Sequence, residues 1–228
     1  MPQALTDAFI KKLIQWSVDK SDAPRYHKHH ITRFAMYKAL RDRFKPLCDD
    51  GSTVLSISKS ITLCDILGLS GAQIVNTTYP EVNILDLSAF SDESFDFTVS
   101  DQVLEHVEGN PFDAVKEAVR PLAPGGWTCH TTCFFNQGHG SPKDFWRFTT
   151  DALALMAREA GLVDIQVDGW GNRDAWALVD LGLRRMKIPD DPEHPIYQLA
   201  TESDSHYHLV VWLVARKPAP TAKVRKRV

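Results

Sequence analysis

The sequence contains few cysteines, four in 228 residues, and no two of them are spaced as C-x-x-C. A disulfide-stabilised scaffold and a cysteine-based zinc site both need more thiols or more regular spacing, so the sequence argues against both. We expect free, buried thiols at Cys48, Cys64, Cys129 and Cys133.

The sequence also lacks an apolar run long enough for a membrane span or a secretory signal. Even the amphipathic start, MPQALTDAFIKKLIQW, carries both acidic and basic residues. An excess of positive charge is absent too, because the formal net charge is -3. We therefore expect a cytoplasmic protein with no membrane span and no nucleic-acid partner. Only residues 218–228 are locally basic, and we interpret them as a flexible tail.

Apolar residues, in contrast, are plentiful: they make up 43% of the chain, which is enough for one buried core. They recur at three- and four-residue spacing in residues 3–18 and 24–44, which predicts two helices. The predicted buried face of the first helix consists of Leu5, Phe9, Leu13 and Trp16. We interpret residues 1–48 as a helical lid on the substrate side and residues 49–217 as the main domain.

Short apolar segments alternate with amphipathic segments along the main domain. The predicted strands read TVLSIS, AQIVNTT, VNILDL, FDFTVSD, WTCHTTCFF, LVDIQVDGWG and HYHLVVWLVARK. The predicted helices read NPFDAVKEAVRPLAPGG, TTDALALMAREAG and RDAWALVDLGLRRM. This alternation predicts an α/β fold with a mostly parallel sheet, whose ligands bind beyond the carboxyl ends of the strands.

Local signals mark the ends of the predicted helices. Asn110 is the expected N-cap of the first, with Pro111 at its first position and the Pro-Gly-Gly of residues 124–126 as its stop. Thr149 or Thr150 is the expected cap of the second helix.

Residues 95–127 carry the most specific pattern in the sequence. They read FDFTVSDQVLEHVEGNPFDAVKEAVRPLAPGGW, in which a strand, a V-L-E-H-V turn, a helix and a P-G-G turn follow in order. This segment resembles the class I S-adenosylmethionine-dependent methyltransferases, in particular the type 11 group, and a wider resemblance runs from Thr53 through Lys217. The resemblance implies a Rossmann-like fold with a mostly parallel seven-stranded sheet and an antiparallel last strand. It also implies S-adenosyl-L-methionine as the cofactor.

In this family the first strand ends in a glycine-rich turn, G-x-G-x-G, that approaches the methionyl part and the ribose of the cofactor. The matching stretch here, VLSISKSITL over residues 54–63, contains no glycine. Ser56, Ser58 and Ser60 keep the backbone N–H groups and add hydroxyls, and Lys59 offers a charge for the methionine carboxylate. Their Cβ atoms also disfavour positive φ, so a rebuilt cofactor turn and a loss of cofactor binding both stay open.

Further cofactor contacts follow from the resemblance at the ends of the next strands. Besides Ser56, Ser58 and Lys59, the expected contacts are Thr77, Asp86, Leu87, Asp101, Gln102 and His106. Thr77 stands where the family has the ribose-binding acid, and Asp86 matches the adenine-binding acid unless it only caps a turn. Asp101 and Gln102 lie where cofactor and substrate meet in the family, and their alternative role is to cap the next short helix.

The loop FFNQGHGSPKDFWRFT, residues 134–149, follows the fifth predicted strand, where the family places substrate-facing groups. Histidine is the usual general base near neutral pH, so His139 is the expected base for a hydroxyl acceptor. Asp144 would orient His139 or act as base itself, and Asp101 completes the expected catalytic set. Arg147 would hold an anionic substrate group, unless it forms an ion pair with Asp144 that only pins the loop.

Other substrate contacts are expected from three separate segments, which the fold would bring to the same edge. They are Tyr26 and His30 in YHKHH, Phe135 in the loop, and Trp170 and Arg173 in DGWGNRDAW. Plain packing is the alternative for the last two, and an exposed lid face is the alternative for the histidine cluster.

No metal site is expected. Some related O-methyltransferases bind a divalent cation with E-x-x-E-H, but here Gln102 replaces the first acid of that pattern. The sequence thus predicts a methyltransferase acting on a hydroxyl of a small molecule, sugar or glycan by direct, SN2-like transfer. The alternative is a methyltransferase-like, non-catalytic binding module with a degenerate turn. The oligomeric state stays open.

Overall fold

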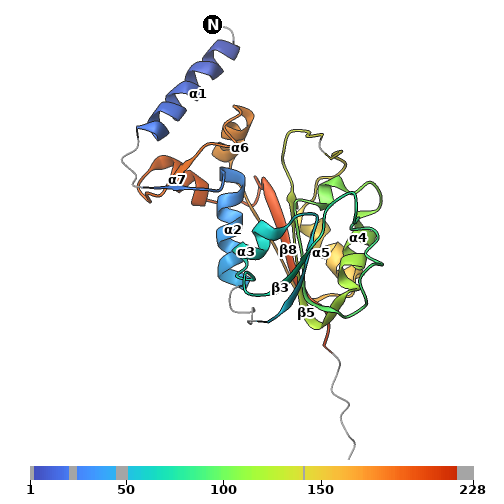
Figure 1. Cartoon of the computed structure of the whole chain (residues 1–228). Coiled ribbons are helices and arrows are strands. Elements are labelled where there is room, and N and C mark those ends of the chain that lie inside the picture. The colour runs from blue at the N-terminus through green and yellow to red at the C-terminus, as the bar shows by residue number, and fades with distance from the viewer. Residues whose placement is uncertain (1–2, 21–24, 45–50, 141, 220–228) are drawn as a thin grey trace, which may run out of the picture.

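The computed structural model describes residues 3–20, 25–44, 51–140 and 142–219, and its centre is a six-stranded sheet (Figure 1). The strand order is β3-β2-β4-β5-β8-β6. The strands of the sheet are β2 (Thr53–Ile57), β3 (Gln73–Asn76), β4 (Phe95–Asp101), β5 (Leu122–Cys133), β6 (Val163–Trp170) and β8 (Val210–Arg216). A separate two-stranded ladder pairs β1 (Tyr26–His27) with β7 (Ile188–Pro189).

The strand directions agree with the predicted fold class. β2 runs parallel to β3 and β4, β4 runs parallel to β5, and β8 runs antiparallel to both of its neighbours. The central strands β2 and β4 are buried along most of their length, as expected for strands that are covered on both faces. The α/β class with an antiparallel last strand is confirmed.

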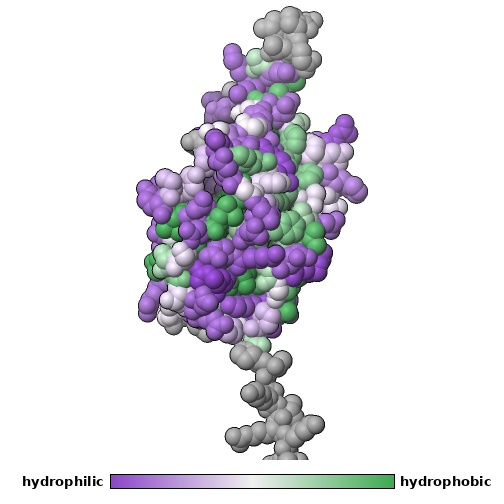
Figure 2. Space-filling view, turned by 90° about the vertical axis from the view of Figure 1, so that its right-hand side faces the viewer, coloured by the Kyte–Doolittle hydropathy of each residue, from purple (hydrophilic) through white to green (hydrophobic). Residues whose placement is uncertain are grey.

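Helices cover both faces of the sheet (Figure 1). One core receives side chains from α2 (Ile31–Phe44), α3 (Ile61–Ile66), α6 (Arg173–Asp180) and α7 (Pro195–Thr201). The other core receives them from α4 (Pro111–Val119) and α5 (Thr150–Glu159). The outer surface on the α4 side of Figure 1 is mainly hydrophilic with scattered hydrophobic residues (Figure 2), which is ordinary for a covered sheet. The sequence analysis predicts neither α3 nor α7, because helices this short do not establish a period.

α1 (Gln3–Asp19) projects from the body of the molecule (Figure 1), and it turns the opposite face from the predicted one toward the core. Ile14 and Val18 pack against the core. The predicted face is largely exposed, at 60% for Phe9, 49% for Leu13 and 61% for Trp16. Apolar residues occur on both sides of this helix, so tertiary packing rather than periodicity selects the buried side. Within the described residues, no helix has the combined length and apolar character that crossing a membrane requires.

The predicted strand VNILDL does not form, which is why the sheet has six strands rather than seven. The segment forms turns with one isolated bridge, between Asn83 and Asp86. β3 is therefore one of the two edge strands of the sheet, with β6 at the other edge. The segment has the run of mostly apolar residues that is typical of a buried strand, but no neighbouring strand pairs with it. Its backbone N–H and C=O groups therefore bond to other partners.

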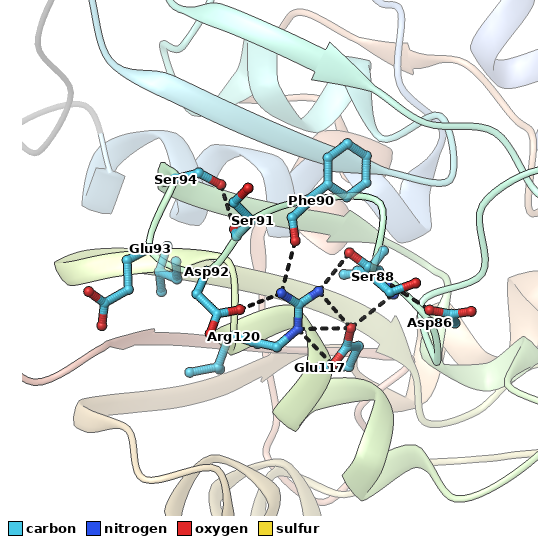
Figure 3. Close-up of polar contacts among 12 residues, drawn as sticks. Asp86, Ser88, Phe90, Ser91, Asp92, Glu93, Ser94, Glu117 and Arg120 are labelled. Atoms are coloured by element: carbon cyan, nitrogen blue, oxygen red, sulfur yellow. Dashed lines mark hydrogen bonds and ion pairs between the residues drawn. The ribbon is translucent and has the colours of Figure 1, made fainter.

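Arg120 provides such partners for the loop that follows this segment (Figure 3). Its guanidinium donates to the carbonyl of Leu87 at 2.6 Å and to that of Phe90 at 2.9 Å. Glu117 and Asp92 both accept hydrogen bonds from the same guanidinium and thereby raise its pKa. The side chain of Arg120, which follows α4, thus holds this loop in place of the hydrogen bonds that pairing with a neighbouring strand would have supplied.

The predicted N-caps are confirmed for two helices. Asn110 accepts a hydrogen bond from the Phe112 amide at 3.1 Å, and Thr149 accepts one from the Ala152 amide at 3.1 Å. Pro111 is the first residue of α4, as expected.

The Pro-Gly-Gly of residues 124–126 does not stop α4, which already ends at Val119. These residues lie inside β5, where the pairing with β4 shifts register. A Cβ atom on Gly126 would lie 2.7 Å from the carbonyl oxygen of Asp96. Glycine therefore serves the close approach of two strands at a bulge rather than the end of a helix.

Three of the four cysteines, Cys64, Cys129 and Cys133, are free and buried as predicted. Burial raises the pKa of Cys64 to about 11 and that of Cys133 to about 12, so both are neutral thiols at physiological pH. Other predictions lie outside the described part of the chain, namely those on Cys48, the side chain of Leu5, the domain boundary at 48–49 and residues 220–228 of the tail.

Candidate active site

The carboxyl ends of β2, β4 and β5 lie side by side, and polar residues follow all three strands. β2 leads into the turn of residues 58–60, and the register of the sheet sets Asp101 of β4 beside Thr131 of β5. Open α/β sheets bind their ligands at this edge, so it is the candidate site.

The glycine-free turn after β2 adopts the backbone conformation that glycines usually provide. The φ angle is 54° at Ser58 and 63° at Lys59, in the left-handed region that costs most residues energy. The two amides point to Thr77: Ser58 N donates to its Oγ1 at 3.0 Å, and Lys59 N donates to its carbonyl at 2.8 Å. Both amides are therefore already hydrogen-bonded within the protein, and a role for them toward the methionine carboxylate stays untested. Thr77 is 5% exposed and supports the turn.

Two of the three serine hydroxyls in this stretch satisfy the protein's own polar groups. Ser56 is buried and its Oγ donates to Asn76 Oδ1 at 2.8 Å, so the expected contact of Ser56 with a cofactor is not met. Ser60 Oγ donates to the Ile57 carbonyl at 2.5 Å and accepts from the Asp101 amide at 2.8 Å. Among the predicted turn contacts, Lys59 has an exposed side chain and Ser58 a half-buried one.

Asp101 is a heavily hydrogen-bonded carboxylate at this edge. Its Oδ1 accepts from Arg33 and from Thr131 Oγ1 at 2.6 Å, and its Oδ2 accepts from the Tyr37 hydroxyl at 2.5 Å. Burial is the largest single effect on the pKa of Arg33 and lowers it, but Asp101, Tyr37 and Glu105 together outweigh burial and the net shift is upward. Burial and the Asp101 carboxylate raise the pKa of Tyr37. Asp101 thus anchors α2 to the sheet and has little free capacity to act as a base.

A small cleft of about 70 Å³, partly open to solvent, lies between the end of β4 and the turns around residue 83. Its walls are largely apolar or neutral and consist of Tyr79, Asn83, Ile84, Gln102, Val103, His106, Val107, Glu108 and Pro142. Gln102 and His106 are therefore the two predicted cofactor contacts that line it. A cleft with apolar walls and a few amide or imidazole groups suits a flat heteroaromatic ligand.

Asp86 and Leu87 do not line this cleft. Asp86 is exposed and accepts a hydrogen bond from the Ser88 amide at 3.1 Å (Figure 3), and bonds from the Ser88 side chain and backbone lower its pKa. This contact matches the turn-capping alternative. Leu87 is fully buried, and its amide donates to Glu117 Oε1 at 2.9 Å, so Leu87 does not offer the expected cofactor contact.

Glu105, His106 and His139 lie together beside the cleft. Glu105 is fully buried: its Oε2 accepts from Thr132 Oγ1 at 2.8 Å, its Oε1 has no partner, and burial raises its pKa. His106 Nδ1 lies 2.9 Å from the Lys143 carbonyl, and the rings of His106 and His139 meet edge to face with 4.8 Å between centroids. The rings of His106 and His139 are both half-buried and reach solvent.

The same three residues form a group whose potential metal-ligand atoms all lie within 4.8 Å of one another. Tetrahedral zinc with ligand bonds of about 2.1 Å keeps its ligands about 3.4 Å apart, so the three side chains would have to draw together to hold such an ion. The expectation that the protein has no metal site stays a prediction.

The loop of residues 134–149 is pinned by an ion pair between Asp144 and Arg147. The two N–O distances are 2.5 and 2.7 Å, and the hydrogen bonds from Arg147 lower the pKa of Asp144 to about 2. The Asp144 carboxylate also accepts from the His139 amide at 3.1 Å and lies 3.3 Å from His139 Nδ1. The geometry matches the structural alternative for Arg147, because its guanidinium is already occupied by a carboxylate.

The other predicted substrate contacts are scattered. Trp170 is 2% exposed, and Tyr26 donates its hydroxyl to the Val18 carbonyl at 2.9 Å. Phe135 is 38% exposed and stacks on Trp176 with 4.1 Å between ring centroids. The two remaining contacts differ in exposure: Arg173 is exposed, whereas half-buried His30 lies near the sheet edge with its Nδ1 2.8 Å from Thr32 Oγ1.

Three site residues are missed by the sequence analysis, namely Arg33, Tyr37 and Arg184. Arg33 and Tyr37 are four residues apart on α2, so helical periodicity places them on one face. No local signal shows that this face meets Asp101, which lies 68 residues from Arg33 in the chain.

Comparison with known proteins agrees with this architecture. Residues 44–129 match the family model described as "Methyltransferase domain". No curated protein matches the chain.

Two solved structures illustrate the likeness of fold. Phosphoethanolamine N-methyltransferase 2 of Haemonchus contortus, in complex with S-adenosyl-L-methionine, is 18% identical with a TM-score of 0.53, and the match covers 80% of this chain and 52% of that chain. A possible exported protein from Bordetella parapertussis is 14% identical with a TM-score of 0.50, and the match covers 83% and 69%. At such identities the likeness concerns the fold alone, and the chain spans about half the length of the Haemonchus enzyme. Residues 44–129 therefore resemble the methyltransferase domain of the type 11 group, and the chain shares its fold with the Haemonchus enzyme.

Proposed function

We propose that the chain is an S-adenosylmethionine-dependent methyltransferase that methylates a hydroxyl of a small molecule, sugar or glycan by direct transfer. The observation that carries the proposal is the small, partly open cleft at the end of β4, most of whose lining residues belong to the matched methyltransferase domain. The Haemonchus enzyme with the same fold is in complex with S-adenosyl-L-methionine. The cleft lies at the sheet edge where this class of fold binds ligands.

The residues present fit the adenosine half of the cofactor better than the methionine half. Tyr79, Ile84 and Val103 offer aromatic and apolar walls for the base, and Gln102 offers an amide. The amide of Lys59 is engaged by Thr77, so its exposed ammonium group is the donor left for the methionine carboxylate. In the glycine-free turn, the side chain of Lys59 would thus bind the methionine carboxylate in place of the backbone amides.

The bound cofactor supplies an electrophilic methyl group on a positively charged sulfur. The chain's own contribution to the reaction is a proton acceptor, and His139 is the side chain best placed for it. Its Nδ1 lies 3.3 Å from Asp144 Oδ2, which favours the tautomer with a free lone pair on Nε2. Because Arg147 lowers the pKa of Asp144 to about 2, Asp144 orients the imidazole and does not itself take the proton.

The N-terminal helices serve as the lid of this site. Arg33 and Tyr37 tie α2 to Asp101, so α2 is the fixed part. α1 exposes Phe9, Leu13 and Trp16, and it is the part that would cover an acceptor and exclude water. The free thiols of the described cysteines support a reducing compartment, which we infer is the cytoplasm.

A second candidate function is a non-catalytic module that binds a metabolite. It is favoured by the turn itself, because Thr77 consumes two amides that the family's fold would present to the cofactor. Cofactor affinity separates the two candidates.

The deciding experiment is a calorimetric titration with S-adenosylmethionine and, separately, S-adenosylhomocysteine. Tyr79 is 50% exposed and lines the cleft, whereas Asp86 is exposed and lies outside it. Stacking of a base on an aromatic ring contributes about 1–3 kcal/mol, so we expect Tyr79→Ala to weaken binding at least about fivefold. Asp86→Ala is the matched control and should bind like the wild type.

If Asp86→Ala binds more weakly and Tyr79→Ala binds like the wild type, the adenine is bound by Asp86, as the family resemblance implies, and not by the cleft. If the folded wild type binds neither ligand, the methyltransferase proposal fails and the non-catalytic module takes its place.

A further inference from the structure

Arg184 is a half-buried arginine at the sheet edge that contacts only neutral partners. It follows α6, and its Nη1 donates to Asn136 Oδ1 at 3.0 Å while its Nε donates to Thr32 Oγ1 at 3.4 Å. A guanidinium has five N–H groups, so three of them, including both on Nη2, donate to no other described residue.

Three other arginines, in contrast to Arg184, are neutralised by carboxylates. Arg33 pairs with Asp101, Arg147 with Asp144, and Arg120 with Glu117 and Asp92. No carboxylate of the described residues lies within ion-pair distance of Arg184. A partly buried charge without a counter-ion is costly, which suggests that the counter-ion comes from a ligand.

The surroundings of Arg184 add positive potential rather than cancel it. The pKa of Arg184 is lowered, chiefly by burial and then by the nearby charges of Arg33 and Arg185. Burial and the charges of Arg33, Arg184 and Arg185 also lower the pKa of His30 to about 4, so that this imidazole is neutral at pH 7. The acids that face the group are Asp101, which is already held by Arg33, and the buried Glu105, whose charge acts on Arg184 from a distance.

The position of Arg184 connects it with the proposed reaction. Together with Thr32, Gln102, Cys133, Phe135 and Asn136 it lines a narrow cleft at the carboxyl edge, whose walls leave no room for a water molecule between them in this structure. Gln102 also lines the larger cleft that we assign to the adenosine. Asn136 lies between Arg184 and His139: its Oδ1 accepts from Arg184, and its Nδ2 is 3.3 Å from His139 Nδ1, a contact without a hydrogen bond when Nδ1 carries the proton.

We infer that the methyl acceptor carries an oxyanion, a carboxylate or a phosphate, which binds to the free N–H groups of Arg184 next to Asn136. The inference rests on the proposed function and names the substrate class for it. An arginine presents paired donors that match the oxygens of carboxylate and phosphate groups, and its neutral partners leave the charge available. The sequence points to Arg147 for this task, but the structure occupies Arg147 with Asp144 and leaves Arg184 unpaired.

The anion site is tested with simple probes, inorganic phosphate and acetate, titrated by calorimetry into the full chain at constant ionic strength. Chloride at the same ionic strength is the reference. We expect wild-type protein to bind phosphate or acetate and Arg184→Gln to lose about tenfold or more in affinity, which corresponds to about 1.4 kcal/mol. Arg158→Gln, which removes an exposed arginine on α5 outside this cleft, is the matched control and should bind the probe like the wild type. The preferred probe distinguishes a phosphate from a carboxylate.

A second variant keeps the test valid if Arg184→Gln does not fold. Asn136→Asp places a carboxylate at the atom that Arg184 already contacts at 3.0 Å, so the protein supplies its own counter-ion. We expect this variant to lose probe binding and to melt at a higher temperature than the wild type.

Titration of S-adenosylmethionine into the same samples separates this inference from the proposed function. Unchanged cofactor binding with lost anion binding in Arg184→Gln supports the inference. Equal affinity of wild type and Arg184→Gln for both probes, or no binding of either probe to the wild type, overturns it even if the cofactor binds.

Discussion

The contact between Arg33 and Asp101 gives the sharpest test of how the N-terminal helix is joined to the sheet. The Arg33 side chain is 16% exposed and that of Asp101 is 12% exposed, so water screens the pair weakly. Asp101→Asn removes the negative charge and leaves Arg33 facing a neutral amide. Removing one partner of a buried ion pair costs about 3–5 kcal/mol, and because the asparagine oxygen still accepts a hydrogen bond we take the lower end, about 3 kcal/mol.

The effect is measurable in two ways. Urea unfolding gives the free energy of unfolding directly, and for a chain of this length about 3 kcal/mol corresponds to a fall in melting temperature of about 6–12 °C. Arg33→Met and the double variant complete a thermodynamic cycle, in which we expect a coupling energy of about 1–3 kcal/mol. Tyr37 and Thr131 keep their hydroxyls throughout, so the cycle isolates the charge pair.

The matched control is the surface pair between Lys143 and Glu108, whose side chains are 74% and 66% exposed at a distance of 3.4 Å. Glu108→Gln should change the free energy of unfolding by less than about 1 kcal/mol, because exposed pairs contribute little. If Asp101→Asn loses no more than Glu108→Gln, or if the cycle shows no coupling, Asp101 does not anchor α2 and the description of the lid is wrong.

Two further predictions concern the core. His130 is fully buried between Ser100 Oγ at 2.7 Å and Thr128 Oγ1 at 2.8 Å, and burial lowers its pKa from 6.5 to about 4. The unfolded chain binds this proton at higher pH than the folded chain, so the free energy of unfolding should fall by about 3 kcal/mol as the pH drops from about 6.5 toward 4. In urea unfolding, His130→Gln should make this dependence on pH weaker. The control His206→Gln, whose side chain is 87% exposed, should leave the dependence unchanged. A Cβ atom on Gly171 would lie 2.0 Å from the Tyr207 carbonyl oxygen, so Gly171→Ala should lower the free energy of unfolding by about 3 kcal/mol or more in the same assay. The control Gly138→Ala, whose Cβ would have nothing within 4 Å, should lower it by less than about 1 kcal/mol. Equal losses in the two variants would contradict the close approach at Gly171.

The sequence alone predicts the features of this protein that depend on neighbours in the chain. The caps at Asn110 and Thr149 are local hydrogen bonds within one turn, and both form as expected. The alternation of strands and helices predicts the α/β class, because the polarity of each segment decides whether it is buried on one side or two. The ion pair of Asp144 and Arg147, three residues apart, is likewise visible in the sequence as an alternative.

Features that need a partner elsewhere in the chain are decided only by the tertiary structure. VNILDL has the polarity of a strand, yet β3 remains an edge of the sheet and Arg120, from beyond α4, orders the loop that follows. α1 carries apolar residues on both sides, and contact with the body selects Ile14 and Val18.

The site divides in the same way. The sequence marks the turn without glycine, but only the fold shows that Thr77, 19 residues from Ser58, holds that turn in the left-handed conformation. The sequence also presents many arginines, and only the fold distinguishes Arg184, which contacts Asn136 from 48 residues away and has no counter-ion among the described residues. Composition and periodicity encode short-range preference and burial, whereas charge compensation depends on which distant side chains the completed sheet brings within a few ångströms.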